Sequence, residues 1–69
     1  MEKLTITLKA ARVNAGLTQV EAARIIHRNK QTIINWEAGH TRITAADLQA
    51  LADIYGIPAE NIRIPERES

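Results

Sequence analysis

The chain has 69 residues, no cysteine and a net charge of +1, which predicts one small domain over residues 1–69 without a disulfide framework or a thiolate metal site. Its longest apolar runs are two or three residues, too short for a transmembrane span or a signal-peptide core. We therefore expect a soluble, cytoplasmic protein that has no membrane partner.

The charges are distributed unevenly along the chain. Residues 1–42 contain seven Lys or Arg and three Asp or Glu, a net +4, whereas residues 43–69 contain two and five, a net −3. A concentrated basic region is typical of proteins that bind phosphates. On charge alone, an ordinary mixed surface is an equally good interpretation.

The first two expected helices have clear start and stop signals. A helix that includes Leu8 is expected to end at Gly16, because glycine adopts the left-handed backbone of a C-terminal cap without a Cβ penalty. Thr18 and Glu21 then form a capping box that begins the second helix.

Two further helices follow. Asn29 is a favoured N-cap for a third helix, which we expect at residues 30–38, before Gly39. Thr44 with Asp47 is a weaker capping box and predicts the start of a fourth helix.

The C-terminal part carries signals for a last, short helix. Gly56 is expected to end the fourth helix, and Pro58 suits the first turn of a fifth. The helix lengths are then about 9, 9, 9, 12 and 5 residues, which predicts an all-α fold, a compact five-helix bundle.

Both ends of the chain have short alternating patterns typical of strands, at residues 4–7 and 62–64. Three arrangements are open: the two segments pair with each other, they pair across a dimer, or they pack as irregular segments. Residues 66–69 are expected to be a frayed tail.

Apolar residues at helical spacing mark the side of each helix that is expected to face the core. They are Leu8, Ala11 and Ala15 in the first helix, Ala22, Ala23 and Ile26 in the second, Ile33 and Trp36 in the third, and Leu48, Leu51, Ala52 and Tyr55 in the fourth. None of these helices is long enough to be stable alone in water, so packing must hold them.

The third expected helix has a second, polar face. Its members are Lys30, Gln31, Thr32 and Asn35. Amides and hydroxyls donate and accept hydrogen bonds at once, as the edges of bases in a DNA groove require, although a polar helix face is ordinarily just solvated. With the short turn before it, this helix predicts a helix-turn-helix at about residues 19–38, with residues 30–38 as the recognition helix.

A longer pattern lies within residues 8–62, about four fifths of the chain. It consists of Leu8, Arg12, Gly16-Leu17-Thr18-Gln19, Ala22-Ala23, Thr32-Ile33, Asn35-Trp36-Glu37, Gly39, Leu48, Leu51-Ala52 and Tyr55-Gly56-Ile57. It resembles the phage-repressor, or Cro-like, helix-turn-helix family of bacterial and phage transcription regulators. The resemblance implies five helices, of which the second and third contact DNA and the fourth and fifth often close a dimer.

One position departs from that family pattern. The turn after the second helix commonly has glycine in the family because it needs a positive φ, and here the residue is His27. Histidine is among the non-glycine residues enriched at positive φ. We expect some strain or a slightly altered turn, and an intact fold.

Several residues are expected to contact DNA. Lys30, Gln31, Thr32 and Asn35 are the candidates for base contacts, since Gln and Asn pair well with adenine and Lys with guanine. The resemblance implies that Gln19 binds a phosphate, helped by the helix N-terminus. The remaining phosphate candidates, next to the recognition helix, are Arg28, His40, Thr41 and Arg42.

Two further features of the recognition helix have a structural interpretation. The resemblance implies that Arg12 pairs with Glu37 and bridges the helices; two unrelated surface charges are the alternative. Ile34 is expected to pack against Ile25 or to meet a thymine methyl group, and packing is slightly favoured.

Other chemistries find little support in the sequence. His27 and His40 lack a third ligand at plausible spacing, so we expect no metal site. No Ser/His/Asp constellation and no Gly-rich phosphate loop is visible, and we expect no enzyme activity, no cofactor and no small-molecule ligand.

The sequence therefore predicts a sequence-specific, double-stranded DNA-binding transcriptional regulator, a nucleoid-associated repressor that acts as a homodimer on a pseudo-palindromic operator. Two alternatives remain: an antitoxin of a toxin–antitoxin pair with the same fold, and a protein–protein adaptor that has lost DNA binding. The candidate dimer contacts are Ile54, Ile57, Ile62 and Ile64, with the alternative that some of them cap the core.

Overall fold

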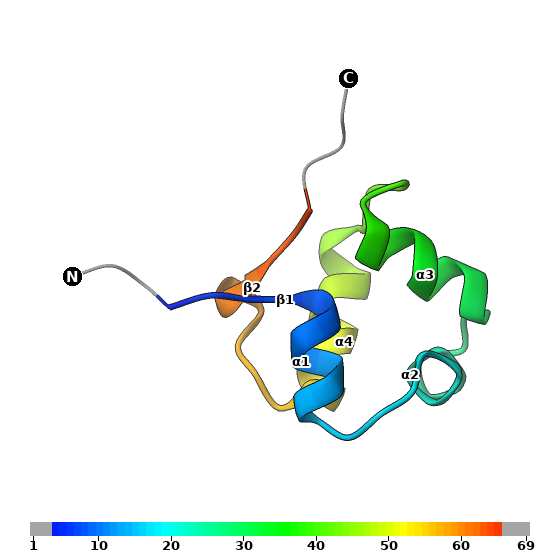
Figure 1. Ribbon diagram of the computed structural model, residues 1–69, viewed down its shortest axis with the longest axis horizontal. Coiled ribbons are helices and arrows are strands. Elements are labelled where there is room, and N and C mark those ends of the chain that lie inside the picture. Colours follow the sequence, from blue (N-terminus) through cyan, green and yellow to red (C-terminus); the bar gives the residue numbers. More distant parts are fainter. Residues whose placement is uncertain (1–3, 66–69) are drawn as a thin grey trace.

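The computed structural model describes residues 4–65 and is mostly helical (Figure 1). In chain order its elements are β1 (Ile6–Thr7), α1 (Leu8–Asn14), α2 (Gln19–Ile25), α3 (Lys30–Ala38), α4 (Ala45–Tyr55), the 3₁₀ helix η1 (Ala59–Asn61) and β2 (Ile62–Arg63). The expected frayed tail, 66–69, lies outside the described residues. No helix in the described range is long and apolar enough to cross a membrane.

The expectation of five helices is wrong in one respect, because the fifth is a single 3₁₀ turn. Asn61 N donates to Pro58 O over 2.9 Å, a bond that closes this tight turn. The chain then leaves the helical conformation at Ile62, where β2 begins. The expected helix of about five residues is therefore a three-residue 3₁₀ turn followed directly by a strand.

The two strands join the ends of the described chain. β1 and β2 are parallel neighbours, with Ile6 opposite Ile62 and Thr7 opposite Arg63, and they lie beside the start of α1 (Figure 1). Of the three open arrangements for the terminal segments, the first is therefore the one that the structure shows.

Side-chain caps begin all four α-helices. Thr18 Oγ1 accepts from Glu21 N over 3.0 Å, and Thr18 N donates to Glu21 Oε1 over 2.9 Å, which confirms the predicted capping box. The hydrogen bond from the Thr18 backbone lowers the pKa of Glu21, because it favours the ionised carboxylate. Asn29 and Thr44 cap α3 and α4 as predicted, and Thr7 caps α1.

The turn between α2 and α3 contains the predicted backbone irregularity. His27 has a φ of 60°, and no other non-glycine residue within 4–65 has a positive φ. Arg28 N donates to Ala23 O over 2.8 Å, so the turn closes against α2, and α3 then runs in a different direction from α2 (Figure 1).

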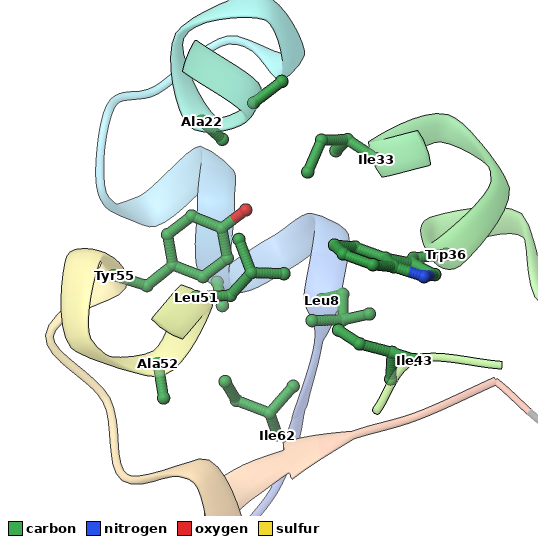
Figure 2. Close-up of a cluster of buried hydrophobic side chains, with 11 residues drawn as sticks. Leu8, Ala22, Ile33, Trp36, Ile43, Leu51, Ala52, Tyr55 and Ile62 are labelled. Carbon is green, nitrogen blue, oxygen red and sulfur yellow. The ribbon is translucent and has the colours of Figure 1, made fainter. Parts of the chain in front are cut away.

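The core fills the space between the four helices (Figure 2). Its buried members are Leu8, Ala11, Ala22, Ala23, Ile33, Trp36, Ile43, Leu51, Ala52, Tyr55 and Ile62. Ala15 is exposed, contrary to expectation, because α1 ends one residue earlier and Ala15 is its C-cap. Small side chains on α2, Ala22 and Ala23, allow α3 to approach it closely.

Candidate nucleic-acid interface

Helix α3 presents one face to the core and the other to solvent. Ile33 is 1% exposed and Trp36 is 6% exposed, so these two side chains fix the rotation of the helix about its axis. Gln31 is exposed, and Asn35 is partly exposed. α3 lies at the edge of the molecule, and no other element within residues 4–65 covers its outer side (Figure 1).

The two amides on this outer face are joined to each other. Gln31 Nε2 donates to Asn35 Oδ1 over 3.0 Å, a contact allowed by their spacing of one helical turn. The bond leaves the carbonyl oxygen of Gln31 and the amide group of Asn35 for other partners. An acceptor and a donor side by side match the N6 donor and N7 acceptor of adenine in the major groove.

The other two predicted base contacts differ in what they offer. Lys30 is exposed at the first position of α3 and forms no ion pair within residues 4–65. Thr32 is partly exposed, and its hydroxyl donates to Asn29 Oδ1 over 3.0 Å. Because its proton is used in the helix cap, the Thr32 hydroxyl is left as an acceptor.

A buried ion pair lies behind α3. Arg12 Nε donates to Glu37 Oε2 over 2.7 Å, and Arg12 Nη2 donates to Glu37 Oε1 over 3.2 Å. The two side chains are 10% and 7% exposed, respectively. The hydrogen bond with Glu37 raises the pKa of Arg12, and Arg12 Nη1 also donates to Leu17 O over 2.9 Å. The pair therefore connects α1, the turn after it, and α3.

Gln19 belongs to the same network. Its Nε2 donates to Glu37 Oε1 over 3.2 Å, which brings the N-terminus of α2 to the last turn of α3. A hollow of about 260 Å³ opens beside this bond, and it is lined by Lys9, Gln19, Ile34, Glu37 and Ala38. Ile34 is thus a partly buried wall of this hollow.

Lys9 is a candidate that the sequence reasoning missed. It is exposed on α1, outside the helix-turn-helix segment, and the fold brings it to the hollow beside Gln19. A signal was present, because Lys9 lies one helical turn before Arg12, the expected partner of the recognition helix.

Among the predicted phosphate contacts, Arg28 has a protein partner. Arg28 Nη2 donates to Asp47 Oδ1 over 2.9 Å, although the Arg28 side chain is still 49% exposed. Asp47 in turn accepts from the Thr44 hydroxyl at the start of α4. The structure therefore directs Arg28 toward α4, apart from the other candidates.

The remaining phosphate candidates lie in the solvent-exposed loop after α3. His40, Thr41 and Arg42 are all exposed, and Arg42 forms no ion pair within the described part of the chain. Gly39 turns the chain with a φ of 79°, and Ile43, 9% exposed, anchors the loop in the core.

The four candidate dimer contacts separate into two groups. Ile62 is 6% exposed and belongs to the core, which corrects its assignment to a dimer surface. Its side chain is buried because β2 pairs with β1 against the helices. Ile54, Ile57 and Ile64 are partly buried at the edge of the core and keep some apolar surface.

No set of three potential metal ligands comes together within residues 4–65.

The short turn between α2 and α3, the buried inner face of α3 and its polar outer face define a helix-turn-helix domain of the DNA-binding class. A helix-turn-helix family model matches residues 8–62. The chain belongs to this family, the Cro-like or XRE-type helix-turn-helix domains of DNA-binding transcription regulators. Searches against curated proteins and against solved structures gave no match.

Proposed function

We propose that this protein is a sequence-specific, double-stranded DNA-binding repressor that inserts α3 into the major groove. The observation that carries the proposal is the joined amide pair, Gln31 and Asn35, on the uncovered face of a helix whose other face is buried. The major groove admits an α-helix and presents a different donor and acceptor pattern for each base pair. A hydrogen-bonded amide pair, with one acceptor and one donor left, is suited to distinguishing such patterns.

Groups that suit phosphates support the same orientation. Lys9 and Gln19 border the hollow at the last turn of α3, and Arg42 follows the same end of the helix. Cationic and amide donors next to a recognition helix bind backbone phosphates and set the register of the protein on the duplex. The bases and the phosphates are then contacted from one side of the domain.

We further propose that two copies bind as a homodimer. A single recognition helix offers few base contacts, and half-sites about 34–36 Å apart allow two helices to bind one face of the duplex. The partly buried isoleucines at the edge of the core, Ile54, Ile57 and Ile64, are the surface for this contact. A dimer with two-fold symmetry predicts a pseudo-palindromic operator, and occupation of that operator represses transcription.

Selection of bound duplexes from a random-sequence library tests this function directly. We expect enrichment of one motif with two related half-sites, a footprint over both, and a dimer by sedimentation at micromolar concentration. As a control, Gln49→Ala should enrich the same motif, because the Gln49 amide donates to the side chain four residues later, as Gln31 does, but on α4 and not on α3. Failure to enrich any motif would contradict sequence-specific binding, and a monomer that protects a single half-site would contradict the dimer.

A further inference from the structure

We propose that Glu37 is a positioning residue that orients Gln19 for its contact with a DNA phosphate, an inference that rests on the proposed function. Gln19 Nε2 donates to Glu37 Oε1 over 3.2 Å. An ionised carboxylate accepts hydrogen bonds and donates none, so it must face the NH₂ group of Gln19 and not the carbonyl oxygen. This fixes the rotation of the amide.

The orientation leaves one donor of Gln19 unused. An amide NH₂ group has two protons, and Glu37 takes one of them. The second N–H points away from Glu37, and it is the one that donates a hydrogen bond to a phosphate oxygen. Without Glu37, the amide rotates freely and presents its carbonyl oxygen to the phosphate for part of the time, which is repulsive.

Glu37 can orient Gln19 because it is itself held firmly. Arg12 donates two hydrogen bonds to the Glu37 carboxylate, at 2.7 and 3.2 Å, in a site where both side chains are at least nine-tenths buried. Glu37 also lies two residues after Asn35 on the same rigid helix. The phosphate contact on α2 and the base contacts on α3 are therefore both positioned relative to Glu37.

Arg12 also compensates the negative charge that Glu37 places near the proposed phosphate contact. A lone carboxylate next to a phosphate site would repel the DNA, but the guanidinium of Arg12 balances the charge of Glu37. Lys9, on the rim of the same hollow, adds a positive charge. Glu37 thus acts on Gln19 without leaving a net negative charge beside the DNA.

The competing interpretation is that the bond to Glu37 withholds Gln19 from the DNA. A double-mutant cycle distinguishes the two, using Gln19→Ala and the paired replacement Arg12→Met/Glu37→Leu. The paired replacement leaves the net charge unchanged and no buried ion unpaired, and such replacements of buried ion pairs are often tolerated. Affinity for a mixed-sequence duplex is measured by fluorescence anisotropy at low salt, after each variant is shown to be folded by circular dichroism.

We expect the paired replacement to weaken binding roughly 3- to 10-fold when residue 19 is glutamine, and to have little effect in the Gln19→Ala background, as for the loss of one hydrogen bond. Equal effects in both backgrounds, or tighter binding with glutamine present, would overturn the proposal. As the matched control, Gln49→Ala removes the corresponding amide–carboxylate bond on α4 without changing the net charge, and it should leave affinity unchanged.

The wild-type protein provides a second test, which does not depend on the variants folding. The two side-chain amide protons of Gln19 give separate NMR signals, and we expect the duplex to shift mainly the one that Glu37 does not hold. Loss of the Glu37-bonded signal on DNA binding would overturn the inference. If wild type binds no duplex, the proposed function itself fails; if it binds and Gln19→Ala binds equally well, the phosphate contact is wrong and the inference falls with it.

Discussion

Replacing Trp36 by alanine should remove a large part of the protein's stability. The Trp36 side chain is 6% exposed and packs against Leu8 and Ile43 on the core side of α3 (Figure 2). Truncation of a buried Trp typically costs about 3–5 kcal/mol of stability. The total stability of a domain of this size is about 3–10 kcal/mol, so the loss is a large part of it.

Urea denaturation followed by far-UV circular dichroism measures this effect, because the variant has lost the single Trp and with it the usual fluorescence signal. The matched control is Val13→Ala on α1, where the side chain is 57% exposed and truncation should change stability by about 0.5 kcal/mol or less. If Trp36→Ala and Val13→Ala had the same midpoint, α3 would have to be rotated and its assigned polar face would be incorrect.

Three further changes test other parts of the structure. Tyr55→Phe should keep or slightly raise stability, because the buried hydroxyl has no hydrogen-bond partner within residues 4–65. Burial, and then the charge of Glu37, raise the pKa of Tyr55 to about 12. Because the pKa of Tyr55 in the folded state lies above the ordinary value near 10, the protonated phenol stabilises the fold fully below about pH 10, and this stabilisation is lost between about pH 10 and 12. In urea denaturation at pH values across this range, the stability of Tyr55→Phe should therefore decline less than that of the wild type. His27→Gly should raise stability by about 0.5–1 kcal/mol in urea denaturation, since it relieves a left-handed residue, and a lower midpoint would show that the turn is unstrained. Arg42→Ala should weaken binding to every duplex and reduce the slope of log affinity against log salt by about 1; an unchanged slope would remove Arg42 from the phosphate contacts.

The parts of the fold that depend on neighbouring residues were predictable from the sequence. α3 begins after Asn29 and ends before Gly39, as these two signals predict, because capping is decided within a few residues. The pairing of the two strands was not predictable in the same way. The alternating patterns at residues 4–7 and 62–64 indicate strands, but the pairing of Ile6 with Ile62 joins residues far apart in the chain, so the local patterns left the partner of each strand open.

The candidate site likewise combines local contacts, which the sequence predicts, with long-range contacts, which it does not. The spacing of Gln31 and Asn35 places both on one side of any helix, so their contact follows from the sequence. The bonds from Gln19 to Glu37 and from Arg28 to Asp47 join residues far apart in the chain, and they depend on how the helices pack. Sequence reasoning therefore identified donors for phosphate without showing which of them already have protein partners.

The specificity of the wild type compared with that of Asn35→Ala tests the central claim most directly. Affinities are measured for the duplex selected from the random library and for the same duplex with its half-sites scrambled, at one salt concentration. Asn35 lies on the outer face of α3, so its replacement should leave the fold intact. We predict that Asn35→Ala loses about 1–3 kcal/mol on the selected duplex and little on the scrambled one, so that the ratio of the two affinities falls. An unchanged ratio would contradict the assignment of this face of α3 to base recognition.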